Sequence, residues 1–165
     1  MVVVVAADRR LSDVSALKLT LARSALNVIE QEVATSQPNL ETGGILLGRR
    51  RQDVLEITRV GTPGPAAVRT PTYFLRDLVH SQSIAREQEL EDGSVWLGEW
   101  HTHPRGPRTP SATDARTYET LASDPDLQFS DGVLSIILVP VNDHYLLSAW
   151  LYRDQVLKGL DVHLV

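Results

Sequence analysis

The chain has 165 residues with 42% hydrophobic and 22% charged side chains, values that are typical of a globular protein and suit one domain, residues 1–165, with one hydrophobic core. Its formal net charge of −5 argues against capture of nucleic acid through a broad basic surface. The sequence contains no cysteine, which excludes disulfide bonds, zinc–thiolate sites and a cysteine nucleophile and is consistent with a cytoplasmic protein.

The first third of the sequence predicts strands on either side of one helix. Residues 2–7 are apolar, but the run is too short for a membrane span or a secretory leader, so we expect an edge strand or a mobile terminus. From Leu21 to Val33 apolar residues recur at helical spacing, with Thr20 placed to cap the start and Pro38 beyond the end. The segments GGILLGRR and VLEITRV then predict a hairpin of two short strands.

The middle of the sequence alternates loops and helices around one strand. Residues 61–72, GTPGPAAVRTPT, are rich in glycine and proline and predict an irregular surface loop. A helix is expected over residues 76–91, ending at the turn Asp92-Gly93, and the segment SVWLGEW that follows has strand composition. A second helix is expected over residues 112–122, and a second turn-rich loop over residues 123–132.

The last part of the sequence predicts three more strands, VLSIILVP, YLLSAWLY and QVLKGLDVHLV. Strands and helices therefore mix along the chain without strict alternation. This order favours a mixed α/β (α+β) fold, in which a mixed β-sheet is flanked by helices.

The chemistry concentrates in GEWHTHPRGPRTPSATDART, residues 98–117. His101 and His103 are two residues apart, so in an extended strand both imidazoles point to the same face. Pro104 and Gly106 place them at the carboxyl end of that strand, where it opens into a loop. Asp114 follows in the next helical segment. Two histidines and one carboxylate are the ligands of a catalytic zinc site, whose fourth position stays open for water.

Each part of this segment also has a simpler interpretation. A His-x-His pair on a strand can serve cross-strand packing or lie on the surface. The residues from Ser111 to Asp114 match the Ser-x-x-Asp/Glu capping box, which does no more than start a helix. The residues alone leave both interpretations open.

A wider pattern includes the same residues. Glu41 heads the segment ETGGILLG, and it is followed by HTHP, by the seven residues 104–110 and by SATD. This order is similar to the JAMM pattern of the JAB/MPN metalloprotease family, which reads Glu, then His-x-His-x(7)-Ser-x-x-Asp. All five positions match, and the flanking segments fit the family's compact domain, so the resemblance extends over most of the chain.

The resemblance implies a role for each matching residue. His101, His103 and Asp114 would bind Zn²⁺, and Glu41 would activate the zinc-bound water and then protonate the leaving amine. Ser111 would donate a hydrogen bond to the developing oxyanion. The implied fold is the JAB/MPN domain, a mixed sheet flanked by helices of the cytidine-deaminase-like type.

The resemblance also implies a reaction. The usual reaction in the family is hydrolysis of an amide or isopeptide bond after the C-terminus of ubiquitin or a ubiquitin-like protein. The short chain with ETGGILLG and GEWHTHP looks like the prokaryotic JAB branch. That branch implies removal of a ubiquitin-like modifier, trimming of a sulfur-carrier protein, or deconjugation of a protein conjugate in systems such as antiphage CBASS defence. The implied partner is thus a protein, not nucleic acid or a membrane, and the sequence indicates neither the substrate nor the oligomeric state.

Two alternatives to this function remain open. RadC-like proteins carry a related segment and have no settled peptidase role, but they typically have Asn between the histidines, where this chain has Thr102. A non-catalytic MPN scaffold is the second alternative, although such proteins have lost metal ligands and this chain has all of them. The loops 61–72 and 123–132 occupy the places of the family's two insertions and are candidates for substrate contacts.

Other residues near the motif have less specific predictions. Glu99 shares a strand face with both histidines, so it is either a partner of the metal ligands or a solvated charge at the strand end. Trp96 and Trp100 are expected in the core or at the rim of the site. Thr102 points away from its neighbours and is expected to bond to the backbone or contact the core. Three further histidines have no metal-spaced partner and are expected to be structural or surface residues, namely His80, His144 and His163.

Overall fold

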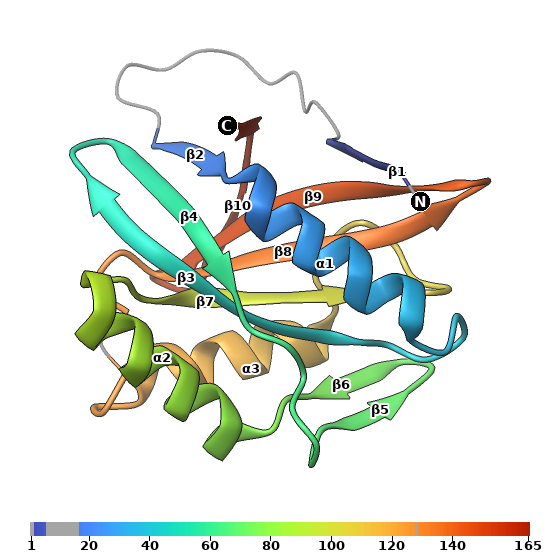
Figure 1. Ribbon diagram of the computed structural model, residues 1–165, viewed down its shortest axis with the longest axis horizontal. Coiled ribbons are helices and arrows are strands. Elements are labelled where there is room, and N and C mark those ends of the chain that lie inside the picture. The colour runs from blue at the N-terminus through green and yellow to red at the C-terminus, as the bar shows by residue number, and fades with distance from the viewer. Residues whose placement is uncertain (1, 6–16, 128) are drawn as a thin grey trace.

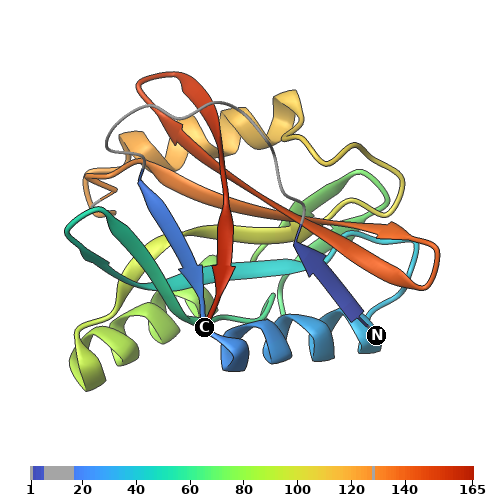
Figure 2. The ribbon, with the colours of Figure 1, turned by 90° about the horizontal axis from the view of Figure 1, so that it is seen from above.

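The computed structural model describes residues 2–5, 17–127 and 129–165. Its centre is a mixed β-sheet with helix α1 (Arg23–Thr35) on one face and helices α2 (Leu78–Asp92) and α3 (Ala112–Ser123) on the other (Figures 1 and 2). The mixed sheet flanked by helices that the sequence predicts is thereby confirmed. No helix among the described residues is long and apolar enough to cross a membrane.

Nine strands of the described chain form the main sheet, in the order β1-β9-β8-β7-β3-β4-β2-β11, with β10 paired to β9. Parallel pairs join β7 to β8, β1 to β9, β2 to β4 and β2 to β11, and the remaining pairs are antiparallel. The strands are β1 (Val2–Val5), β2 (Lys18–Leu21), β3 (Gly43–Arg51), β4 (Val54–Val60), β7 (Val95–Thr102), β8 (Val133–Val141), β9 (His144–Arg153), β10 (Val156–Leu160) and β11 (Val162–Leu164). A separate hairpin consists of β5 (Val68–Thr70) and β6 (Tyr73–Leu75).

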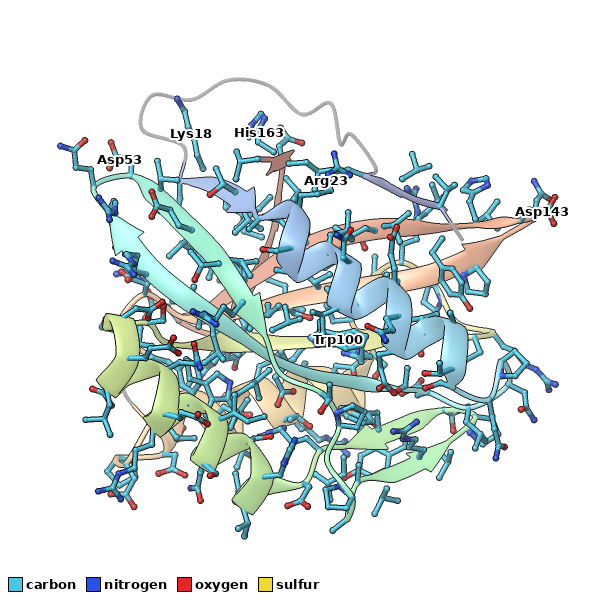
Figure 3. All side chains as sticks on the ribbon, viewed as in Figure 1. Lys18, Arg23, Asp53, Trp100, Asp143 and His163 are labelled. Carbon is cyan, nitrogen blue, oxygen red and sulfur yellow. The ribbon has the colours of Figure 1, made fainter. Side chains whose placement is uncertain are left out.

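Side-chain alternation along the central strands supplies the core on both faces of the sheet. On β3, Leu46 packs with the buried face of α1, whereas Ile45 and Leu47 pack with Trp96 and α2. Trp100 is fully buried with the α1 cluster, and it lies near the middle of the molecule (Figure 3). Both tryptophans of β7 are therefore core residues, as one of the two predictions for them states.

Helix α1 begins later than the sequence predicts. Its buried residues recur at helical spacing as expected, but Thr20 does not cap it, because Thr20 lies in β2 and pairs with His163 of β11. The residue before the helix, Ala22, has no side chain that could cap it. Thr20 is therefore part of the sheet, although the local sequence pattern predicts it as the helix cap.

Two further predictions differ from the structure. Residues 61–72 were expected to be an irregular loop, but Val68–Thr70 pairs with Tyr73–Leu75 around the turn at Pro71. The last segment, expected as one strand, forms two, because Asp161 separates β10 from β11. The two halves pair with β9 and β2, which lie far apart in the sheet. Of the run 2–7, expected as an edge strand or a mobile terminus, Val2–Val5 forms the edge strand β1, and residues 6 and 7 lie outside the described residues. The predicted turn at Gly93 is confirmed, and its φ of 75° lies in the left-handed region that glycine adopts freely.

Candidate metal centre

Three side chains predicted as metal ligands converge at the carboxyl end of β7. The Nε2 atoms of His101 and His103 are 2.9 Å apart. The Asp114 carboxylate lies beside both, with Oδ1 at 3.4 Å from His101 Nε2 and Oδ2 at 3.3 Å from His103 Nε2. Within the part of the chain that the structure describes, these residues form the one group of three or more potential ligands whose atoms lie together. Each histidine is 4% exposed.

Strand geometry positions the two histidines. His101 pairs with Ile137 of β8 and Thr102 with Leu138, and the His103 amide donates to the Leu138 carbonyl at 2.8 Å, so the backbone remains extended past the end of β7. The period of two then points both imidazoles to the same face. The loop that follows is anchored to β9, where Ser148 Oγ and Trp150 Nε1 donate to the Arg108 carbonyl at 2.7 and 3.0 Å.

A backbone carbonyl selects the tautomer of His103. Nδ1 of His103 lies 2.8 Å from the Pro107 carbonyl oxygen, which can only accept, so Nδ1 carries a proton. In the neutral imidazole Nε2 is then free of a proton and presents a lone pair toward His101 and Asp114. Burial lowers the pKa of His103, but the bonds to Asp114 and Pro107 outweigh it and place this pKa above the usual value.

Asp114 belongs both to the ligand group and to a capping box. Ser111 caps α3, since its Oγ accepts from the Asp114 amide at 3.1 Å and its own amide donates to Asp114 Oδ2 at 2.6 Å. Burial acts to raise the pKa of Asp114, but hydrogen bonds to His101, His103 and Ser111 hold it well below the ordinary range. The two interpretations of this segment are therefore not exclusive, because the cap aims the carboxylate at the histidines.

Glu41 lies with this group although it is far away in sequence. Strand β3 pairs with β7 so that Gly43 faces His101, and the Thr102 amide donates to the Thr42 carbonyl at 2.8 Å. Glu41 therefore continues β3 on the face of the histidines, and its side chain is 5% exposed. Burial raises the pKa of Glu41, Asp114 adds to the rise, and both histidines oppose it.

The arrangement fits a tetrahedral cation such as zinc. Two ligands at tetrahedral angles, each 2.0–2.1 Å from a zinc ion, stand about 3.3 Å apart. The two imidazole Nε2 atoms are 2.9 Å apart, and each lies 3.3 or 3.4 Å from a different oxygen of the Asp114 carboxylate. Since His103 Nε2 presents a lone pair toward His101 Nε2, a proton or a cation must lie between the two nitrogens. Imidazole nitrogens with a carboxylate are a set that zinc prefers.

Of the two predictions for Glu99, the solvated charge is wrong, and a role as partner of the metal ligands stays a prediction. Its side chain is 8% exposed, so it is not a solvated charge, and its ion-pair partner is Arg76. Arg76 is also 8% exposed and lies over the ring of Trp96, 5.2 Å from the centroid. Burial raises the pKa of Glu99, while Arg76 and His101 oppose the rise. Sequence patterns could not find this pair, because Arg76 comes from the segment before α2.

Substitution of Arg76 tests how much this buried pair stabilises the fold. Arg76→Met is expected to lower the free energy of unfolding by about 3–5 kcal/mol, because it leaves the Glu99 carboxylate buried without its partner. Urea titration measures the difference. The control is Arg49→Met, whose ion pair with Asp92 is one-third exposed and is expected to contribute less than about 1 kcal/mol. Equal losses in the two variants would contradict the prediction.

The two loops predicted to contact substrate lie at opposite ends of β7. Thr70, from the first loop, accepts a hydrogen bond from the Glu41 amide at 2.8 Å, so this segment borders the site. The second loop, residues 123–132, leads into the start of β8, and Phe129 packs edge-on against Trp96 at 6.1 Å between ring centroids. The second loop therefore does not border the histidines, because β8 runs parallel to β7 and begins at the end away from them. Its contact with a substrate stays a prediction.

The remaining predictions concern residues for which the sequence predicts no catalytic or metal-binding role. Thr102 contacts the backbone as expected, since its Oγ1 accepts from the Thr42 amide at 2.9 Å. His80, His144 and His163 lie outside the ligand group, and Figure 3 shows His163 at the periphery of the molecule.

Comparison with known proteins agrees with this geometry. Residues 25–152 match the family described as prokaryotic homologs of the JAB domain. Proteins named CD-NTase/cGAS isopeptidase from Escherichia coli (strain TW11681) and Vibrio cholerae serotype O1 (strain ATCC 39315 / El Tor Inaba N16961) are each 37% identical to the chain, over 51% and 53% of its length. These matches span only 55% and 58% of the two relatives.

A solved structure resembles the chain over nearly its whole length. The solution structure of protein DSY2949 from Desulfitobacterium hafniense has a TM-score of 0.69 and 26% identity, over 89% of this chain and 92% of that one. The family match covers well over half of the chain and includes all five residues of the motif. The chain belongs to the family of prokaryotic homologs of the JAB domain.

Proposed function

We propose that the chain is a zinc-dependent JAMM metallopeptidase, an isopeptidase that cleaves an amide or isopeptide bond at the C-terminus of a ubiquitin-like protein. The observation that supports it is the convergence of His101, His103 and Asp114 beside the buried carboxylate of Glu41. We also place its activity in the cytoplasm, since a chain without cysteine needs no oxidising compartment.

The names of the relatives support a narrower substrate. Two proteins that share 37% identity with part of this chain are named CD-NTase/cGAS isopeptidase. The substrate that we propose is accordingly a conjugate in which an enzyme of the CD-NTase/cGAS type is joined to another protein through an isopeptide bond. The chain would release the two partners by hydrolysis.

In the proposed mechanism the three ligand residues bind the metal and Glu41 transfers the proton. His101, His103 and Asp114 would hold the zinc, which when bound supplies a positive charge that polarises the scissile carbonyl and acidifies water. Glu41 takes a proton from the attacking water and passes it to the nitrogen of the leaving amine. Because burial raises its pKa, this carboxylate is a stronger base than an exposed glutamate, which favours the first of these two proton transfers.

Ser111 can cap α3 and bind the oxyanion at the same time. In the capping box its Oγ accepts a hydrogen bond from the Asp114 amide, so the hydroxyl proton is not used by the cap. That proton is available to an oxygen that gains negative charge when the carbonyl is attacked. The two roles use different parts of the same hydroxyl group.

Two substitutions of Ser111 separate these roles. Ser111→Gly and Ser111→Ala both remove the hydroxyl, and each is expected to lower kcat by roughly 10²-fold or more through loss of an oxyanion donor. Only the alanine variant is expected to lose about 1 kcal/mol of unfolding free energy, because glycine is nearly as good as serine at the start of a helix. Near-normal kcat in the glycine variant would restrict Ser111 to capping.

Cleavage of a defined substrate tests the proposed function directly. The chain, loaded with zinc, is incubated with a ubiquitin-like protein fused through its terminal Gly-Gly to a reporter, and with the same tail joined to a lysine side chain. Mass spectrometry is expected to show a cut after the last glycine and none after chelation of the metal. Intact substrates in the presence of bound zinc would favour a non-catalytic scaffold.

A further inference from the structure

A carboxylate outside the motif joins three parts of the chain beside the site. Glu32, in the last turn of α1, has a side chain that is 16% exposed. Its Oε1 accepts hydrogen bonds from Ser36 Oγ at 2.7 Å and from Thr42 Oγ1 at 2.8 Å. The same oxygen lies 3.3 Å from Nη2 of Arg69, and Nη1 of Arg69 donates to Ser36 Oγ at 3.0 Å. These contacts join α1, the segment before β3, and β5.

These contacts form a closed ring of residues that includes Glu41. Thr42, which follows Glu41, is held by Glu32 through its side chain and by Thr102 through its backbone. The Glu41 amide donates to the carbonyl of Thr70, the neighbour of Arg69 on β5. Figure 1 shows the C-terminal end of α1 close to the β5–β6 hairpin, where the ring closes.

Glu41 lies just before the first residue of β3, outside the regular pairing of that strand. Helix α1 ends at Thr35 and β3 begins at Gly43, so Glu41 lies in a connecting segment. Its position therefore depends on the bonds of its own amide and of Thr42. Bonds to an ionised group are stronger and better directed than neutral ones, and Glu32 supplies such an acceptor to Thr42 and to Arg69.

We propose that Glu32 is the positioning residue for Glu41, an inference that rests on the proposed function. The contacts of Glu32 are with Ser36, Thr42 and Arg69, and none of these is a residue of the ligand group. It acts through Thr42 on one side and through Arg69 and Thr70 on the other, and it fixes the backbone from which the Glu41 carboxylate reaches the histidines. Its loss is expected to misplace the proton acceptor while the metal ligands stay in place.

Amide exchange and kinetics on Glu32→Ala test the inference. Relative to wild type, the amides of Glu41 and Thr42 are expected to exchange at least tenfold faster, and kcat to fall roughly 10²-fold, the effect of a misplaced catalytic group. KM and zinc content are expected to stay at wild-type values, since all three ligands remain. Glu32→Gln keeps an acceptor oxygen for Thr42 and is expected to restore most of the protection and of kcat.

A second carboxylate on the same helix provides a matched control. Glu30 accepts from the Val3 amide of β1 at 3.3 Å and does not contact the ring, so Glu30→Ala is expected to leave both exchange and kcat unchanged. If Glu32→Ala does not fold, Thr42→Val removes the same hydrogen bond from the other side and carries the same expectation.

Either of two results would overturn the inference. One is unchanged exchange at Glu41 and Thr42 in the Glu32→Ala and Thr42→Val variants. The other is faster exchange combined with a kcat equal to that of Glu30→Ala. Exchange needs no substrate, so a wild-type chain that cleaves nothing would count against the proposed function alone, and the exchange result would still decide whether Glu32 holds the Glu41 segment.

Discussion

Glu41→Gln is expected to lower kcat for cleavage of a ubiquitin-like C-terminal fusion by roughly 10²–10⁴-fold, the range typical of a lost general acid–base group. The amide has nearly the shape of the carboxylate but cannot take a proton from water. Glu41 is 5% exposed, so bulk water cannot readily replace it as proton acceptor. Initial rates at saturating substrate, compared with wild type, measure the loss.

The metal content of the Glu41→Gln variant shows whether the loss of kcat comes from lost proton transfer or from lost zinc. Since Glu41 is not one of the three converging ligands, the variant is expected to keep about one zinc ion per chain, as a site of this kind holds. Glu30→Gln, which makes the same chemical change on α1, serves as the control. A variant with zinc bound and with kcat close to wild type would remove Glu41 from the mechanism.

His103→Ala is expected to abolish stable zinc binding. The remaining pair, His101 and Asp114, is smaller than the set of three protein ligands that catalytic zinc sites use. Elemental analysis after dialysis against a weak chelator is expected to fall from about one zinc per chain to a small fraction, and cleavage is expected to be lost with it. The unfolding temperature in excess zinc is expected to drop as well, since metal no longer stabilises the folded state.

A histidine outside the site provides the comparison for this variant. His163 lies on β11 at the periphery of the molecule (Figure 3), and His163→Ala is expected to keep its zinc and its activity. Retention of a full equivalent of zinc by His103→Ala would show that the ion binds elsewhere, and the proposed metal centre would then be wrong.

The local part of the site could be predicted from the sequence because local rules determine it. The spacing of His101 and His103 predicts a shared strand face, and the spacing of Ser111 and Asp114 predicts a capping box, and both geometries are present. Glu41 was predicted only through the resemblance to a family. It reaches the histidines through the pairing of β3 with β7, which joins residues about 60 positions apart, and no local pattern encodes that pairing.

The supporting contacts could not be predicted, because each joins segments that are distant in the chain. Arg76, from the segment between β6 and α2, pairs with Glu99 of β7, and Glu32 of α1 contacts Arg69 in a hairpin that the sequence predicts as a loop. The prediction of Thr20 as a helix cap fails for a similar reason. Thr20 pairs with β11, a strand near the end of the sequence. Tertiary contacts override the local preference for a helix or a loop where the tertiary pairing stabilises the chain more than the local structure does.

The loop after His103 depends on contacts with residues that are synthesised later than the motif. The Arg108 carbonyl receives its two hydrogen bonds from Ser148 and Trp150, which are 40 and 42 residues further along the chain. During synthesis, all five motif residues are added to the chain before these anchors, and domains assemble from the N-terminus as the chain emerges. A nascent chain that ends before β9 therefore holds every motif residue but lacks these two anchors. The proposed site therefore has its full set of supporting contacts only after strand β9 has been added.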